Sequence, residues 1–260
     1  MFHRRLKQKE RDCILKDIKK EKQLLFYSYL TVRQKKTIHY GQFTDDGELL
    51  GIIAYLKGLP FHAFSYYFIK ETIKIHPLLS YIKTDLRIPD GSIGSTLVNE
   101  RDQTFFLSQI EPVHPVKEML LMKHTDLACL PPTDDRVIRL DLTHFDMIQL
   151  KMKEFNAMAF IEEEFNFPFF GVMQNEDLIA VGGYHIFDRD YVEVGNIGTV
   201  EHMRRKGWGK RISAELTRKG REISKDVYLY VFSDNIPAVK LYESLGYQCI
   251  SKFYLTEFDM

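Results

Sequence analysis

The stretch that decides the fold runs from Val200 to Lys210 and reads Val-Glu-His-Met-Arg-Arg-Lys-Gly-Trp-Gly-Lys. A strand pattern ends before it, and a pattern with helical spacing begins within it. Glycines let the backbone approach a ligand closely, and a helix N-terminus adds partial positive charge. Full charges come from five basic side chains: Arg204, Arg205, Lys206, Lys210 and Arg211. The stretch predicts a cradle for a pyrophosphate, with a basic turn that binds nothing as the alternative.

The surrounding pattern predicts an α/β domain. The glycine spacing fits neither G-x-x-x-x-G-K-[ST] nor a G-x-G-x-x-G after the first strand, which argues against a P-loop NTPase and a Rossmann site. The second half of the chain predicts the order β-α-α-β-β-β-α-β-α-β. The strands are expected near 136–142, 169–173, 178–187, 191–200, 227–232 and 249–254, and the helices near 143–154, 156–165, 207–224 and from 235. Thr143 is expected to cap the first of these helices.

A second informative segment, Asn-Ile-Pro-Ala-Val-Lys-Leu-Tyr-Glu-Ser-Leu-Gly-Tyr, begins at Asn235, about 35 residues after Val200. Pro237 in its first turn and Gly246 at its end are typical of a helix. Seven residues make almost two helical turns, so Asn235 and Tyr242 are expected to project from the same face. The alternative for Tyr242 is an aromatic residue on the core face of the helix.

Taken together, the two segments resemble the Gcn5-related N-acetyltransferases (GNAT). The loop Arg204-x-x-Gly207-x-Gly209 is similar to the family's acetyl-CoA loop, R/Q-x-x-G-x-G/A. The segment from Asn235 is similar to the family's second signature, N-x-x-A-x-x-L-Y-E-x-L-G-F. The resemblance covers about residues 136–255.

The resemblance extends to a two-domain organisation. Val181–His185 and Gly195–Val200 resemble the glycine acyltransferase-like members, in which a degenerate N-terminal half precedes an active C-terminal half. The two prolines of the segment 130–135 make it the best linker. We therefore expect two acyl-CoA N-acyltransferase folds in tandem, each a mixed sheet flanked by helices: a degenerate domain at 1–130 and a catalytic domain at 131–260.

The resemblance implies acetyl-CoA as co-substrate and assigns residues to it. The strand ending at Val200 would pair with the pantetheine arm, which would lie in a splay between the strands 191–200 and 227–232. The loop would bind the pyrophosphate, Asn235 would contact the cofactor near the thioester, and Tyr242 would protonate the leaving thiolate. The cofactor-binding residues implied are Gly198, Thr199, Val200, Arg204, Arg205, Lys206, Gly207, Trp208, Gly209, Lys210 and Asn235.

The general base is less clearly indicated. Some relatives place a glutamate on the strand before the asparagine turn, but Val227–Phe232 contains no carboxylate. If the preceding hairpin turns at Arg189, His185 and Glu193 lie opposite each other and could relay a proton through water. A slip of one residue would separate them, and an ordinary polar cross-strand pair is the alternative. The carboxylates at 162–164 (Glu162, Glu163 and Glu164) either select a cationic acceptor or are simply solvated.

The first half of the chain carries weaker signals. Residues 1–36 hold twelve Lys or Arg against four Asp or Glu and predict amphipathic helices with a solvated basic face. Residues 38–56 predict a hairpin around Asp-Asp-Gly at 45–47, followed by a strand at 61–68. The Gly/Ser loop at 90–95 has no basic residue and is expected to be an ordinary turn before a helix.

Composition excludes several classes of protein. The chain has 260 residues, 45% of them hydrophobic, with 36 basic and 36 acidic residues. A zero net charge argues against a dedicated nucleic-acid binder, and this apolar content argues against disorder. No apolar run is long enough to cross a membrane, and no signal peptide is expected. Cys13, Cys129 and Cys249 are expected to be reduced, mostly buried thiols in a cytoplasmic protein.

The resulting hypothesis is an acetyl-CoA-dependent N-acetyltransferase whose amine acceptor attacks the thioester directly in a ternary complex. The acceptor would be a small-molecule amine or a peptide or protein amine, and no metal is implied because no cluster of ligands has the required spacing. One alternative is a non-catalytic acyl-CoA-binding regulatory protein, and another is an interaction protein that uses the basic N-terminal helix. The sequence leaves the oligomeric state open, with a homodimer as one option.

Overall fold

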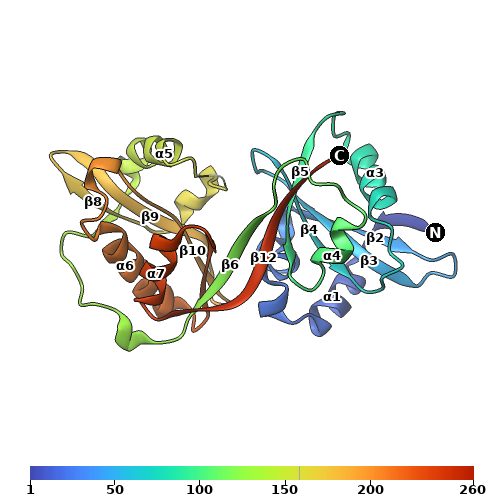
Figure 1. Ribbon diagram of the computed structural model, residues 1–260, viewed down its shortest axis with the longest axis horizontal. Coiled ribbons are helices and arrows are strands. Elements are labelled where there is room, and N and C mark those ends of the chain that lie inside the picture. The colour runs from blue at the N-terminus through green and yellow to red at the C-terminus, as the bar shows by residue number, and fades with distance from the viewer. Residues whose placement is uncertain (158) are drawn as a thin grey trace. The chain divides into compact units, whose positions relative to one another are not determined.

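The computed structural model describes residues 1–157 and 159–260 and forms two compact units (Figure 1). The first unit comprises Met1–Met119 together with Ser251–Met260, and the second comprises Leu120–Ile250. Each unit contains a mixed β-sheet flanked by helices, as the predicted α/β class requires. None of the described helices has the length and apolar character needed to span a bilayer.

The strands of the first unit follow the order β1-β2-β3-β4-β5-β12. Neighbouring strands are antiparallel except β4 and β5, which are parallel. The strands are β1 (Phe2–Arg5), β2 (Thr37–Phe43), β3 (Leu49–Leu56), β4 (His62–Phe68), β5 (Ile93–Asn99) and β12 (Tyr247–Asp259). The helices are α1 (Gln8–Asp17), α2 (Leu24–Leu30), α3 (Ile75–Leu86) and α4 (Gln103–Leu107). The expected hairpin is therefore confirmed as β2 and β3.

Alternation along β3 gives this sheet an apolar cluster on each face. Ile52 packs in a cluster with Phe26 of α2, whereas its neighbour Ile53 packs in another with Leu78 and Ile82 of α3. Successive side chains of a strand point to opposite faces, so one strand serves both layers.

The turn at 90–95 is placed differently from the expectation. Gly91 has a φ of 74° and the chain enters the strand β5 at Ile93, so the turn precedes a strand and not a helix. The helix lies before the turn instead, as α3, and ends at Leu86. Ser95, Thr96 and Val98 then favour an extended strand because branched and small polar side chains fit a pleated surface.

The C-terminal strand belongs to the first unit over most of its length. Residues Phe253–Asp259 of β12 pair antiparallel with Asn99–Ile93 of β5. Phe258 is 2% exposed and packs against Phe64 and Phe106, with ring centroids 5.7 and 6.0 Å away. The division into domains at 1–130 and 131–260 stays a prediction.

The second unit has the strand order β6-β11-β10-β9-β8-β7. Its strands are β6 (Lys117–His124, whose first three residues belong to the first unit), β7 (Ile138–Leu140), β8 (Phe169–Gln174), β9 (Asp177–Phe187), β10 (Val192–Thr199) and β11 (Val227–Phe232). Its helices are α5 (Phe145–Glu154), α6 (Trp208–Ile223) and α7 (Ile236–Glu243). Val181 packs under α5, and the adjacent Gly182 faces Ile212 and Leu216 of α6, so these two helices cover opposite faces of the sheet.

Two expectations for the second unit need correction. Asp141 caps a short 3₁₀ helix, Leu142–His144, where its carboxylate accepts the Thr143 N–H at 2.9 Å, and α5 begins only at Phe145. The helix ends at Glu154 as expected, because Asn156, with a φ of 51°, takes the left-handed conformation that terminates helices. The expected helix at 156–165 is reduced to a short 3₁₀ helix, Glu162–Asn166, and residue 158 of that stretch lies outside the described residues.

The first strand and the cysteines also differ from expectation. The strand expected at 136–142 is reduced to Ile138–Leu140. Cys13, Cys129 and Cys249 are free thiols, but all three are exposed and not buried.

Candidate functional site

The strands β10 and β11 lie side by side only where they begin. In the described residues they pair in parallel at Val192↔Val227 and Glu193↔Tyr228 alone. The other edge of β10 remains paired with β9 as far as Thr199. Beyond Glu193, β10 therefore presents an open backbone edge toward β11, which is the arrangement that an extended ligand can pair with.

Two bulges accompany this separation, one in each strand of the β9–β10 pair. The register shifts between Glu193 and Val194, where β9 holds the extra residue, and again between Gly195 and Gly198, where β10 holds it and Asn196 has a φ of 56°. Asparagine is among the few residues that tolerate this conformation, and a bulge bends its strand. At the end of the strand, Thr199 O is occupied by a hydrogen bond of 3.2 Å from Arg204 Nε.

The basic loop forms a nest of backbone N–H groups at the start of α6. Gly207 is the N-cap residue, with φ 81° and ψ 6°, and Arg205 has a φ of 61°. Left-handed residues followed by a helix turn successive N–H groups toward one point, which suits an anion. Arg205 is exposed, Lys206 Nζ lies 3.3 Å from Met203 Sδ, and Lys210 is half-buried. The backbone of the loop is compatible with the expected cradle, and its binding of a pyrophosphate stays a prediction.

Gly209 shows that the loop leaves room for more than its own side chains. A Cβ at this position would find its nearest atoms at 3.5 Å, on Leu241 of α7, and 3.9 Å, on Thr199 of β10. Its φ is not in the left-handed region, so the protein's own backbone and packing do not require a glycine here. The end of β10, the start of α6 and the helix α7 meet around this position.

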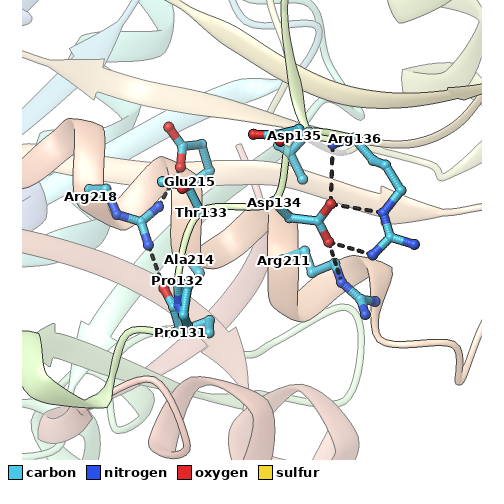
Figure 2. A pocket seen from close by; sticks show the side chains of 11 residues that line it. Pro131, Pro132, Thr133, Asp134, Asp135, Arg136, Arg211, Ala214, Glu215 and Arg218 are labelled. Carbon is cyan, nitrogen blue, oxygen red and sulfur yellow. Dashed lines mark hydrogen bonds and ion pairs between the residues drawn. The ribbon is translucent and has the colours of Figure 1, made fainter.

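A linker segment braces the first turn of α6, as Figure 2 shows. Asp134 accepts Arg136 Nε and Nη2 at 2.8 and 2.7 Å and forms an ion pair with Arg211 Nε at 2.7 Å. The hydrogen bond from Arg136 lowers the pKa of Asp134 to about 2, so the carboxylate stays charged at neutral pH. The two guanidinium groups lie over the Trp208 indole, 4.9 and 5.0 Å from the ring centroid.

The same linker lines a cavity of about 460 Å³ beside α6. Its walls carry Arg218, which donates to Glu215 and, at 2.6 Å, to Pro131 O (Figure 2). Sequence reasoning treated this segment only as a linker and missed Asp134 and Arg136. The signal was present as an Asp-Asp-Arg triplet beside the two prolines, but its partner Arg211 is distant in sequence.

The helix α7 places the two residues expected from the second signature. Asn235 is exposed and caps the helix through a hydrogen bond from Ala238 N to its Oδ1 at 3.3 Å. Tyr242 is half-buried, with its ring centroid 5.9 Å from that of Tyr247. Burial raises the pKa of Tyr242 to about 12, and its hydroxyl has no hydrogen-bond partner among the residues that the structure describes. A neutral phenol of this kind can donate a proton to a ligand.

The structure contradicts the expected pairing of His185 with Glu193. Glu193 lies opposite Ile186, and Val194 lies opposite Tyr184, so His185 is the extra residue of a bulge. The hairpin does not turn on Arg189 but half a residue beyond it, with Phe187 opposite Val192, and this shift in register separates His185 from Glu193.

Instead, His185 pairs with one of the three carboxylates at 162–164. His185 Nδ1 lies 2.9 Å from Glu164 Oε1, and Asn196 Nδ2 donates to Glu164 Oε2 at 2.6 Å. Glu164 is only 3% exposed, whereas Glu162 and Glu163 are exposed. Sequence reasoning missed Asn196, although an asparagine between two glycines inside a strand is a signal for a bulge.

Glycines in β10 bring these side chains against its backbone. A Cβ on Gly195 would collide with the His185 ring, and a Cβ on Gly198 would collide with the ring of Phe155, at the end of α5. The face of β10 that carries α5 thus holds His185, Glu164 and Asn196 next to the start of the open edge.

Comparison with known proteins agrees with this geometry. Residues 138–247 match the family model described as acetyltransferase (GNAT) family. No curated protein matches the sequence. A GCN5-related N-acetyltransferase from Sphaerobacter thermophilus is similar in structure, with a TM-score of 0.69, 11% identity, and coverage of 99% of this chain and 95% of that chain.

Two further solved structures are similar. An acetyltransferase from the GNAT family of Colwellia psychrerythraea has a TM-score of 0.60 at 15% identity, with both chains covered at 100%. A tandem GNAT protein from the clavulanic acid biosynthesis pathway has a TM-score of 0.59 at 9% identity and covers 86% of this chain and 82% of that chain. At these identities the likeness to solved structures shows the fold alone. Residues 138–247 match the model of the GNAT acetyltransferase family.

Proposed function

We propose that the protein transfers an acetyl group from acetyl-CoA to a primary amine, which attacks the thioester directly in a ternary complex. The observation that carries this proposal is the convergence of three parts of the second unit: the open edge of β10, the nest at Gly207 and the protonated Tyr242 on α7. Acyl transfer from an acyl-CoA is the activity of the GNAT family, whose model residues 138–247 match.

The chain's own groups suit each part of the co-substrate. The N–H groups of Gly207, Trp208 and Gly209 would hold the pyrophosphate, helped by the basic side chains of the loop. The open edge near Thr199 would pair with the pantetheine amides after Arg204 leaves the Thr199 carbonyl. Asn235, exposed at the start of α7, would contact the arm near the thioester. Acetyl-CoA would supply the activated acyl group, and no metal enters this scheme.

Tyr242 is proposed as the general acid. The bond from the acyl carbon to the amine forms, the bond to sulfur breaks, and the phenol proton goes to the departing thiolate. A pKa near 12 keeps the phenol protonated at neutral pH, because burial disfavours the phenolate. The proton lost by the amine goes to a base on the other side of the open edge.

The setting of the reaction is also part of the proposal. Free thiols at Cys13, Cys129 and Cys249 support a reducing compartment, and we place the protein in the cytoplasm. The acceptor is a small-molecule amine or an amine of a peptide or protein.

A thiol-release assay tests the proposal. The full chain is incubated with acetyl-CoA and, separately, glycine, tyramine, spermidine and a lysine-containing peptide. We expect release of free CoA that requires both protein and amine, together with a product heavier than the amine by one acetyl group in mass spectrometry. Tight binding of acetyl-CoA without amine-dependent release for any acceptor would contradict the proposal and favour a regulatory acyl-CoA-binding protein.

A further inference from the structure

A buried carboxylate holds the histidine beside the open edge of β10. Glu164 is 3% exposed, and its two oxygens contact His185 Nδ1 at 2.9 Å and Asn196 Nδ2 at 2.6 Å. These three side chains come from the 3₁₀ helix Glu162–Asn166, from β9 and from the bulge of β10. Burying a carboxylate is costly unless hydrogen bonds compensate it, so a site that keeps one here gains something from its charge.

The contact with Glu164 fixes the tautomer of His185. A carboxylate accepts hydrogen bonds, so the imidazole carries its proton on Nδ1 and keeps Nε2 as the basic nitrogen. Nε2 lies against the backbone of Gly195, where a Cβ would collide with it. Gly195 is two residues beyond Glu193, the last residue of β10 that pairs with β11.

That position suits the acyl end of the co-substrate. An arm whose pyrophosphate lies at Gly207 and which follows the open edge back along β10 ends where β10 and β11 meet. The meeting point is at Glu193 and Gly195, next to His185. Tyr242 follows Leu241 of α7, and Leu241 and Thr199 of β10 are the residues nearest to a Cβ built on Gly209.

We propose that His185 is the general base of the transfer and that Glu164 is its positioning residue, with Asn196 holding Glu164 in place. This inference rests on the proposed function. As the amine nitrogen bonds to the acyl carbon, its proton passes to His185 Nε2, while the phenol proton of Tyr242 passes to the sulfur that leaves. The resulting imidazolium is stabilised by the Glu164 carboxylate on its other nitrogen, and both residues regain their starting states by exchange with water.

The role of Glu164 is separable from that of an ordinary structural residue. Replacing a residue that acts only through His185 has no further effect on kcat once His185 is gone. Replacing a residue that supports the fold lowers activity both in the wild type and in the His185 variant. The test therefore uses Glu164→Gln, His185→Gln and the double variant, with acetyl-CoA and the fastest amine of the four-member panel. Asn196→Gly removes the amide but keeps a residue that accepts a φ of 56°. Glu162→Gln, an exposed carboxylate on the same 3₁₀ helix, is the matched control.

The expected pattern is specific. His185→Gln should lower kcat by about 100-fold or more, as for loss of a general base. Glu164→Gln should lower kcat by roughly tenfold or more with the KM for acetyl-CoA nearly unchanged, Asn196→Gly should lower it less, and the double variant should equal His185→Gln. Glu162→Gln should match the wild type.

The outcomes separate this inference from the proposed function. Wild-type kcat in Glu164→Gln, or a double variant in which the two losses multiply, would overturn the positioning role while leaving acyl transfer intact. Wild-type kcat in His185→Gln would overturn the role of His185 as the general base. If Glu164→Gln does not fold, His185→Gln alone tests the general base, and Asn196→Gly tests the positioning role. An unchanged kcat in Asn196→Gly would then overturn the positioning role. Absence of CoA release from the wild type with every amine would overturn the proposed function and this role with it.

Discussion

At the scale of single residues, burial sets the protonation state of Tyr242. Its pKa is raised to about 12, so the phenol stays neutral at every pH below that value and can act as an acid. Tyr242→Phe keeps the ring and its packing on Tyr247 but removes the hydroxyl. We expect kcat to fall at least about tenfold, with little change in acetyl-CoA affinity. Steady-state kinetics with chemistry shown to be rate-limiting checks this, and wild-type turnover would assign the proton to water or another group.

The two loop glycines are required for different reasons, so their variants should differ in their effects on CoA binding and on stability. Gly207 has a φ of 81°, so Gly207→Val strains the nest itself. Gly209 has room for a Cβ, so Gly209→Ala leaves the loop unstrained and probes only the space for a ligand. Gly207→Val should weaken CoA binding by about two orders of magnitude, roughly 3 kcal/mol. Gly209→Ala should weaken binding with an unchanged midpoint of urea unfolding. Calorimetry measures the CoA affinity of both variants, and urea titration measures their stability. Unchanged CoA affinity in the folded variants would contradict the predicted pyrophosphate cradle.

At the scale of elements, the bulged strand β10 is held by rings that lie on its glycines. A Cβ on Gly198 would collide with the ring of Phe155, a partly buried residue at the end of α5. Forcing an extra methyl into a packed site costs about 1–3 kcal/mol, so Gly198→Ala should lower the free energy of unfolding by that amount. Adding Phe155→Leu to Gly198→Ala should recover part of the loss, since it removes the colliding ring. Urea unfolding of the two single variants and the double variant gives the coupling, and purely additive losses would show that the two sites do not interact.

The same strand shows where sequence reasoning stops. The loop at Gly207 and the helix from Asn235 could be predicted because each depends on residues that are adjacent in the chain. The partner of His185 could not, because it depends on the register in which β9 and β10 pair after their turn, and because Glu164 is distant in sequence. Register of this kind is decided by packing across the sheet, here by glycines against rings, and not by the alternation of a single strand.

At the scale of the whole molecule, the C-terminal strand stabilises the unit formed by the first residues of the chain. A linear division at 130 could not foresee this, because long-range pairing leaves no local signal in an amphipathic strand. Phe258 of β12 is 2% exposed among the aromatic residues of the first unit. Phe258→Ala should cost about 3–5 kcal/mol, the usual cost of truncating a buried phenylalanine. Hydrogen exchange should show the loss of protection in β4 and β5, whereas an effect confined to β8–β10 would contradict the assignment.

The number of cofactor sites follows from comparing the two units. In the first unit β4, α3 and β5 repeat the order of β10, α6 and β11: a strand, a helix and a strand parallel to the first. The loop before α3, residues 69–74, contains no glycine and one glutamate, and its N-cap Lys74 has a φ of −110° in place of the left-handed Gly207. Its N–H groups are therefore not turned toward one point, and a nest for an anion does not form.

The glycine-rich turn of the first unit does not replace that loop. Gly91 and Gly94 stand before and within β5, and Lys83 pairs with Asp90 of this turn at 2.7 Å. A pyrophosphate there would meet a carboxylate and few compensating charges. We therefore expect calorimetry with acetyl-CoA to give a stoichiometry near one per chain, and Gly207→Val to leave no site of wild-type affinity. A second site of similar affinity that survives Gly207→Val would show that the first unit binds the cofactor by a geometry other than the nest, and that the chain is a tandem enzyme.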